Sequence, residues 1–68
     1  MESITVGFIG TGAMGEHMCR HIAQSNNYRV LAYDLNQTPL KRLAQYGVTM
    51  ASNCEELAED SNVTILSL

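Results

Sequence analysis

Three glycines at fixed spacing are the residues of this sequence best suited to chemistry. They stand in the segment 10–15 (GTGAMG), between an apolar stretch and a run with helical periodicity. Gly10 allows a tight turn out of a strand, Gly12 lets a pyrophosphate approach the backbone, and Gly15 allows close packing of the helix on a sheet. The free N–H groups at a helix N-terminus add about half a positive charge. The segment therefore predicts a phosphate-binding loop.

An acidic residue further along the chain supports this interpretation. Asp34 lies 19 positions after Gly15, at the end of the second predicted strand. A carboxylate there can accept hydrogen bonds from the ribose hydroxyls of a dinucleotide, and it repels a 2′-phosphate. Because no arginine is among the three residues that follow, we expect NAD rather than NADP. Lys41 and Arg42, one helical turn further on, keep NADP open as the less favoured alternative.

Strand-like and helix-like stretches alternate along the chain and would position these residues. Strands separated by helices form parallel sheets with right-handed crossovers. We therefore expect an α/β fold, a Rossmann-type parallel sheet in the order βαβαβαβ. The predicted strands cover 4–9, 30–34, 48–51 and 63–68, and the first and third predicted helices cover 13–25 and 53–60.

The same patterns predict helix caps and inward-facing side chains. The second helix would open with Thr38 as N-cap and Pro39 at its first position, and Gly47 would close it. A capping box over 52–55 would start the third helix. The side chains expected to face inward are Met14, Met18, Ile22 and Ala23 on the first helix, Leu40, Leu43 and Ala44 on the second, and Leu57 and Ala58 on the third.

The number of elements is small for this architecture. Four strands and three short helices make an incomplete version of a dinucleotide-binding domain, and the sequence stops inside an apolar strand. We therefore interpret residues 1–68 as the N-terminal part of a larger domain. The remainder of that domain and a catalytic helical domain would lie outside these residues.

Composition excludes several classes of partner. The chain has 68 residues, with 4 Lys+Arg against 7 Asp+Glu, a formal charge of -3. Without a basic patch we expect no nucleic-acid partner. The apolar runs are far shorter than a membrane span of about 20 residues, and Met1–Ser3 does not open a secretory signal. We expect a cytoplasmic protein without membrane contact.

The potential metal ligands do not form a recognisable set. Cys19 and Cys54 match no zinc or redox spacing, and we expect two small residues that are buried or half-buried. His17 and His21 are spaced as a helical ligand pair, but a site needs a third ligand. We therefore predict no metal site.

One longer segment resembles a known family. Residues 7–18 (GFIGTGAMGEHM) resemble the N-terminal signature of the β-hydroxyacid dehydrogenases, which include 3-hydroxyisobutyrate dehydrogenase, tartronate semialdehyde reductase and 6-phosphogluconate dehydrogenase. The Met14–Gly15 pair, with Met18 behind it, is more specific than the glycines alone. Residues 47–60 and 63–68 are similar to the family's third strand and helix and its fourth strand. His17 and His21 depart from the family, where many members have Pro and Asn.

The resemblance implies a set of cofactor contacts. Thr11, Ala13 and Met14 would lie along the dinucleotide with the three glycines. Asp34 and Asn36 would lie at the adenosine ribose. Ser67 and Leu68, at the carboxyl end of the fourth strand, would lie near the cofactor, where ligands of parallel sheets also bind in general.

The resemblance also implies a reaction, the reversible oxidation of a 3-hydroxy acid with NAD(P). The family's substrate-binding Ser-Gly segment and catalytic lysine have no counterpart here, and Lys41 on the second predicted helix is the single lysine. We assign no catalytic residue to this chain. The hydroxy acid would bind through the missing domain, and the full-length protein is compatible with a homo-oligomer.

Two other functions fit the same loop. A regulatory module that senses NAD or another nucleotide uses a glycine loop and a strand-end Asp without a catalytic half. An imine or pyrroline-carboxylate reductase has a similar Gly-Phe-Ile-Gly opening, although Asp34 and the Met14–Gly15 pair count against it. The sequence that follows residue 68 would separate the sensor from the enzyme.

Overall fold

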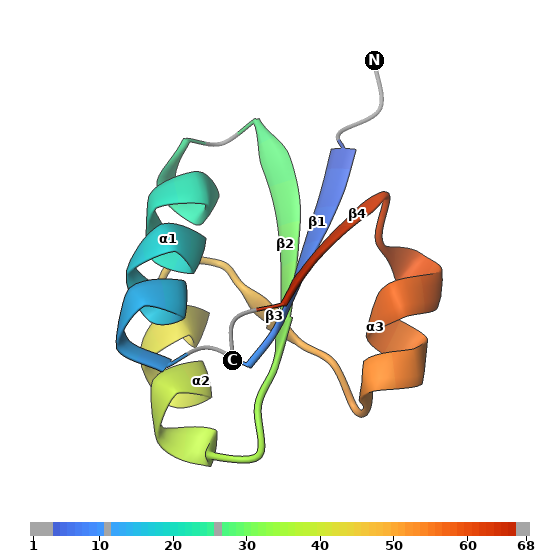
Figure 1. The fold of residues 1–68 in the computed structure, drawn as a ribbon. Helices are drawn as coiled ribbons and strands as arrows, with labels where there is room; N and C mark the ends of the chain where they lie inside the picture. The colour runs from blue at the N-terminus through green and yellow to red at the C-terminus, as the bar shows by residue number, and fades with distance from the viewer. Residues whose placement is uncertain (1–3, 11, 26, 67–68) are drawn as a thin grey trace.

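The computed structural model describes residues 4–10, 12–25 and 27–66, and strands and helices alternate through them (Figure 1). This alternation confirms the predicted order βαβαβαβ. In chain order the elements are β1 (Ile4–Ile9), α1 (Gly12–Gln24), β2 (Tyr28–Tyr33), α2 (Gln37–Ala44), β3 (Thr49–Met50), α3 (Cys54–Asp60) and β4 (Val63–Leu66).

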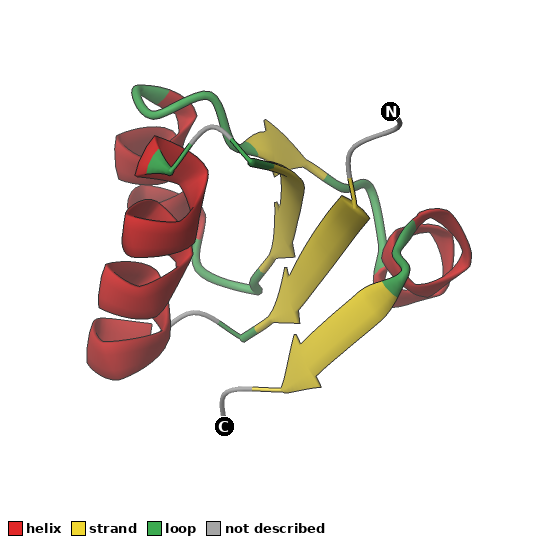
Figure 2. Cartoon of the chain, turned by 90° about the horizontal axis from the view of Figure 1, so that it is seen from above, coloured by secondary structure: helices red, strands yellow, loops and turns green. Residues whose placement is uncertain are grey.

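The four described strands form one parallel sheet in the order β3-β2-β1-β4. Helices α1 and α2 cover one face of the sheet and α3 covers the other (Figures 1 and 2). Right-handed crossovers produce this arrangement, because α1 and α2 lead to strands on one side of β1 whereas α3 leads back across it to β4. The Rossmann-type α/β fold predicted from the sequence is confirmed.

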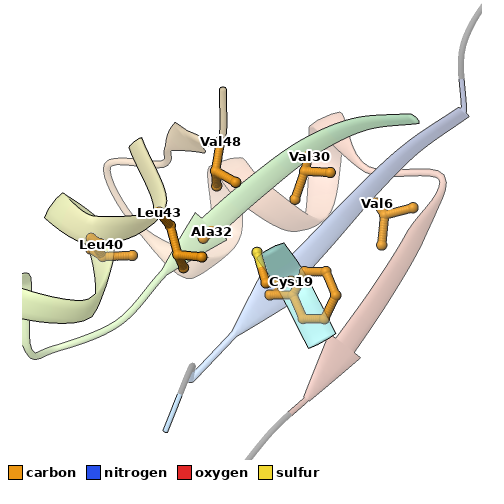
Figure 3. Packing of buried hydrophobic residues seen from close by; sticks show 8 residues of the cluster. Val6, Cys19, Val30, Ala32, Leu40, Leu43 and Val48 are labelled. Atoms are coloured by element: carbon orange, nitrogen blue, oxygen red, sulfur yellow. The ribbon is translucent and has the colours of Figure 1, made fainter. Parts of the chain in front are cut away.

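The main core lies between the sheet and the pair α1 and α2. Phe8 of β1, Cys19 of α1 and Leu43 of α2 are completely buried there. Figure 3 shows how these elements contribute side chains to one cluster. Its buried members are Val6, Phe8, Cys19, Val30, Ala32, Leu40, Leu43 and Val48. Burial of the Cys19 thiol raises its pKa to about 12, so this cysteine behaves as an apolar core residue.

Helix α1 presents only part of its predicted inward stripe to the sheet. The inward stripe was expected to include Met18, but 45% of Met18 is exposed. Gly15 and Cys19 are buried, in keeping with the expectations of a close-packing glycine and a buried thiol, and Ile22 and Ala23 of the predicted stripe are half-buried against the core. The prediction was wrong for Met18 because it grouped the large apolar side chains by helical spacing alone, whereas Cys19 fills the core at this level of the helix. The Met14 side chain lies outside the described part of the structure.

Helix α2 begins earlier than predicted. Its N-cap is Asn36, whose Oδ1 accepts a hydrogen bond of 3.0 Å from the Thr38 N–H. Thr38 and Pro39 therefore lie inside the first turn, so the predicted Thr38 cap is wrong. Asn and Thr are both good N-caps, and the sequence alone did not separate them. Gly47 lies in the turn that follows the helix, and Ala44 is exposed rather than inward-facing.

Helix α3 also begins one residue away from the predicted cap. Asn53 Oδ1 accepts a hydrogen bond of 2.7 Å from the Glu56 N–H, so Asn53 and not Ser52 is the N-cap. Leu57 is completely buried as predicted, whereas Ala58 is exposed. Cys54, expected to be at least half-buried, is exposed at the first position of the helix.

The strands are shifted relative to the sequence prediction. Strand β2 begins at Tyr28 and ends at Tyr33, while β3 is reduced to two residues. A hydrogen bond of 2.9 Å from the Ala51 N–H to the Ala32 carbonyl continues the contact between these strands beyond Met50. At the opposite edge, β4 ends within the described residues at Leu66.

Gly7 allows α3 to approach β1 closely. A Cβ built at Gly7 would lie 2.5 Å from Leu57 Cδ2 and would also collide with Ser61 Oγ. Such contacts are far inside van der Waals distance. The buried Leu57 side chain therefore rests directly on the backbone of β1, and this position tolerates no side chain unless Leu57 and Ser61 shift.

We expect Gly7→Ala to destabilise the protein by about 1–3 kcal/mol, the usual effect of forcing an extra carbon into a packed site. Urea unfolding followed by circular dichroism measures the change. Thr64→Ala, at an exposed position of β4, serves as the control and should shift the midpoint much less. Equal midpoints for Gly7→Ala and the unmodified protein would show that α3 does not pack as described.

An ion pair joins the two helices on the first face. Arg42 of α2 donates from Nε to Glu16 Oε2 and from Nη2 to Glu16 Oε1, each at 2.7 Å. The Arg42 guanidinium lowers the pKa of the Glu16 carboxyl below its usual value of 4.5. Glu16 was predicted on the solvated side of α1, and it is half-buried beside Arg42.

This pair predicts a pH-dependent contribution to stability. Because the folded-state pKa of Glu16 is depressed, the contribution is present above pH 4.5 and is lost as the pH falls through the lower folded-state value. The difference in urea midpoint between the unmodified protein and Glu16→Gln should be larger at pH 7 than at pH 3. Glu59→Gln, which removes an exposed carboxylate of α3, controls for net charge. A difference that does not change with pH would contradict the assignment.

Candidate nucleotide-binding site

The glycine loop and the acidic residue meet at one edge of the sheet. Strands β1 and β2 pair in register up to Ile9 and Tyr33, so both end at the same level. The Gly10 N–H then donates a hydrogen bond of 2.9 Å to the Tyr33 carbonyl. This bond holds the first residue of the loop beside Asp34, the residue that follows β2. The two features singled out in the sequence are therefore neighbours in the structure, and their role as one binding site stays a prediction.

The backbone of the loop requires glycine at two positions. Gly10 and Gly12 have φ angles of 77° and 40°, and residues with a Cβ atom rarely adopt such positive values. A Cβ built at Gly12 would have no described protein atom within 4 Å, other than those of its chain neighbours and its own helix. The space over Gly12 is therefore available to a ligand. Ala13 and Met14 belong to the first turn of α1, while Thr11 lies outside the described residues.

Asp34 shapes the turn between β2 and α2. Its Oδ1 accepts a hydrogen bond of 2.8 Å from the Asn36 N–H, and Asn36 Oδ1 in turn caps α2 through the Thr38 N–H. These two links orient the Asp34 side chain at the end of the sheet. The predicted ribose contact of Asn36 must be made with its amide oxygen already engaged with α2.

A hollow of about 360 Å³ lies at this edge. It is bordered by the end of β1, the end of β2 and the start of α3, and its lining residues are Ile9, Gly10, Tyr33, Asp34, Leu35 and Cys54. Volumes of this size are typical of small-molecule sites. Leu35 and Cys54 were not predicted as site residues. Cys54 could have been found from the sheet order, because the chain that follows β3 must pass beside the end of β2.

The remaining predicted contacts involve β4. This strand pairs with β1 up to Leu66, which lies opposite Ile9. Ser67 and Leu68 lie outside the described residues, so their proximity to the cofactor stays a prediction. The same holds for the contact predicted at Thr11.

Other polar residues named from the sequence lie elsewhere. His17 and His21 are exposed on α1, and His17 Nδ1 lies 3.3 Å from Arg20 Nη2. Within the described ranges, no group of three His, Cys, Asp or Glu side chains could hold a metal ion. Of the two cations considered for a 2′-phosphate, Arg42 is engaged with Glu16 and Lys41 is exposed on α2.

Comparison with known families identifies the type of domain. The family model described as the NAD-binding domain of 6-phosphogluconate dehydrogenase matches residues 5–68. The chain belongs to this family. Membership confirms the resemblance to the β-hydroxyacid dehydrogenases and makes this a domain for a nicotinamide cofactor.

Individual relatives agree with the family. A probable mitochondrial 3-hydroxyisobutyrate dehydrogenase of Arabidopsis thaliana is 36% identical over 63 residues, which make up 93% of this chain and 18% of the relative. A structure of Mycobacterium tuberculosis 3-hydroxyisobutyrate dehydrogenase with L-serine has a TM-score of 0.86 and 25% identity, and the match covers 98% of this chain and 23% of that one. The chain thus spans about a fifth of the length of these proteins.

An imine reductase is also similar in structure. The enzyme from Pseudomonas sp. has a TM-score of 0.88 and 28% identity, over 96% of this chain and 22% of that one. The similarity covers the same cofactor-binding part. None of the helices in the described part of the chain is long and apolar enough to cross a membrane.

Proposed function

We propose that this chain is the NAD-binding part of an oxidoreductase that transfers a hydride between the nicotinamide and a 3-hydroxy acid. The observation that carries the proposal is the hydrogen bond from Gly10 to Tyr33, which places the glycine loop and Asp34 at one edge of the sheet. This edge is the carboxyl end of parallel strands, where such folds bind dinucleotides. Family membership and the relatives named 3-hydroxyisobutyrate dehydrogenase support the same conclusion.

In this proposal the pyrophosphate lies over the loop and the first turn of α1. The open space at Gly12 lets phosphate oxygens reach the backbone, and the N–H groups at the start of α1 have no partner within the helix. Gly10, Thr11, Gly12, Ala13, Met14 and Gly15 make up this binding segment. Their role is to hold and orient the dinucleotide.

The adenosine ribose lies at the end of β2. There the Asp34 carboxylate accepts hydrogen bonds from the ribose hydroxyls, while Asn36 borders the same turn. A 2′-phosphate would meet the charge of Asp34, and Arg42 is already paired with Glu16. We therefore infer a preference for NAD over NADP.

The chemistry of the reaction is divided between this chain and residues outside it. When bound, the nicotinamide supplies the hydride-accepting carbon. The residues of this chain bind and orient the cofactor, while a lysine outside them takes the hydroxyl proton, as the family resemblance implies. A hydroxy-acid substrate bound through a further domain, a homo-oligomeric full-length protein, a cytoplasmic location and no nucleic-acid or membrane partner complete the proposal.

Two alternatives remain distinguishable. The similarity to imine reductases favours a second candidate, in which the same cofactor site reduces an imine. The carboxylate of Asp34 and the Met14–Gly15 pair favour the hydroxyacid dehydrogenase. A nucleotide sensor would bind NAD with the same residues but would turn over neither a hydroxy acid nor an imine. Assays of both substrate classes with the full-length protein separate the three.

The cofactor assignment predicts the effect of Asp34→Ala. Loss of hydrogen bonds from a carboxylate to the ribose should weaken NAD binding by about tenfold to a hundredfold, as expected for bonds to a charged group. NADP binding should change little, because repulsion is removed together with the hydrogen bonds. Isothermal titration calorimetry measures the dissociation constants of NAD and NADP for both proteins.

Glu59→Ala, on the exposed side of α3, is the matched control and should bind both cofactors as before. Equal affinity of the unmodified protein for NAD and NADP would contradict the preference for NAD. Failure to bind either cofactor in a folded protein would overturn the proposed function as a whole.

The phosphate position predicts the effect of Gly12→Val. The new side chain would enter the open space above the loop, where the pyrophosphate is proposed to lie. We expect NAD binding to weaken by at least about a hundredfold, since both the close approach and the favoured backbone conformation are lost. Gly47→Val, at a positive φ of 85° remote from the loop, controls for backbone strain. Similar losses of affinity in both variants would argue against the proposed phosphate position.

A further inference from the structure

A groove between helices α1 and α2 has no part in the proposed cofactor site. Its volume is about 230 Å³, below the range of about 300–1,000 Å³ that is typical of pockets for drug-sized ligands. It shares no lining residue with the hollow beside Asp34. Its size suits a small ligand. This α1–α2 groove is lined by Glu16, His17, Arg20, Arg42, Gln45 and Tyr46.

The two guanidinium groups of the groove differ in their charge partners. Arg42 donates to both carboxylate oxygens of Glu16, so these two charges balance each other. Arg20 forms no ion pair with a carboxylate in the described part of the chain. The pKa of the Glu16 carboxyl is lowered chiefly by the hydrogen bonds from Arg42 and further by the charge of Arg20, so this charge acts within the groove. With His17 counted as neutral, the lining carries one uncompensated positive charge, although the whole chain has a formal charge of -3.

The Arg20 side chain is held in place by its neighbours. Its guanidinium carbon lies 5.8 Å from the centre of the Tyr46 ring, and its Nη2 lies 3.3 Å from His17 Nδ1. Arg20 is half-buried there, whereas Lys41 on α2 is exposed. A guanidinium that is already ordered presents a planar set of N–H groups, and it loses less freedom on binding than a mobile cation does. Arg20 is therefore the cation of the groove best prepared to bind an anion.

The charge and the walls of the groove select the kind of anion. A guanidinium binds a carboxylate through two parallel hydrogen bonds, and one uncompensated positive charge balances one negative charge. A phosphate dianion would bring a second negative charge close to the Glu16 carboxylate, which is unfavourable. Tyr46 exposes 37% of its surface, and its ring offers an apolar wall to the body of a ligand. These features together fit a monocarboxylate.

We propose that the α1–α2 groove binds a small carboxylic acid with an apolar body, whose carboxylate pairs with Arg20 and whose body lies against the Tyr46 ring. The groove is separate from the proposed dinucleotide site, so this ligand and NAD bind at the same time. The ligand contacts α1 and the turn that follows α2, and it therefore strengthens the packing between the two helices.

Equilibrium dialysis of labelled benzoate against the full-length protein saturated with NAD tests the proposal. Benzoate combines one carboxylate with a flat apolar body, and the bound NAD keeps the glycine loop occupied. We expect the groove to account for one bound benzoate per chain. Unlabelled benzoate should displace this ligand, whereas benzamide, which has nearly the same shape without the charge, should not.

Substitutions distinguish the groove from other sites on the protein. Arg20→Gln removes charged hydrogen bonds and should raise the dissociation constant of this benzoate at least about tenfold. Tyr46→Leu keeps an apolar wall but removes the ring beside Arg20, and should raise the constant by about twofold to fivefold. Arg29→Gln makes the same change of charge at an exposed position of β2 outside the groove, and should bind benzoate normally. Circular dichroism checks the fold of each variant, and Tyr46→Leu decides the question if Arg20→Gln does not fold.

Each outcome decides for or against the groove. Loss of one bound benzoate in Arg20→Gln, with unchanged binding in Arg29→Gln, supports the site. Equal binding by the unmodified protein and Arg20→Gln would overturn the proposal, because the carboxylate would then be held by other residues. Displacement of benzoate by NAD would place the anion at the glycine loop and would also overturn it. If the protein does not bind NAD, the proposed function fails, while the comparison of Arg20→Gln with Arg29→Gln still decides on the groove.

Discussion

The hydrogen bond between the Gly10 N–H and the Tyr33 carbonyl is the contact on which the site depends. It extends the pairing of β1 and β2 by one residue beyond the last strand pair, just where the first strand turns into the glycine loop. The register of the two strands already brings their ends to the same level, and this bond holds the first residue of the loop beside Asp34. With it, the proposed phosphate and ribose contacts are fixed relative to one another before any ligand arrives.

The rest of the fold maintains this alignment from both faces of the sheet. On one face, Phe8, Cys19 and Leu43 pack α1 and α2 against the strands, and the pair of Glu16 and Arg42 joins the outer sides of these helices. On the other face, Leu57 fixes α3 against β1. Each helix next to the glycine loop or the hollow is therefore held by buried side chains, so the positions of the loop and of Cys54 follow from packing.

The sequence predicted the architecture because its signals are local and agree with one another. Glycine spacing, the strand-end Asp34 and alternating periodicities all indicate the same fold, which the structure and the family confirm. The caps of α2 and α3 were wrong by one or two residues because neighbouring Asn, Ser and Thr residues are nearly equivalent caps. Which of them is used depends on how the helix sits on the sheet, which is tertiary information.

Contacts between distant segments could not be predicted for the same reason. Nothing near Gly7 in the sequence indicates that Leu57 rests on it, and the apolar pattern of α1 wrongly placed Met18 among the inward-facing residues. Cys54 lies at the hollow because β3 is next to β2 in the sheet, so the chain that follows β3 passes the end of β2. Small residues at close contacts carry weak sequence signals, although they decide how near two elements come.

The direct contact of the Leu57 side chain with the backbone at Gly7 has a mechanical consequence. Because Gly7 has no side chain, Leu57 contacts the backbone of the strand that leads into the glycine loop, so a displacement of α3 presses directly on that strand. This contact therefore couples the position of α3 to that of the strand that carries the glycine loop. A ligand that contacts both the loop and the start of α3 would meet two segments that are already positioned relative to each other. A substitution that shifts one of them is expected to shift the other.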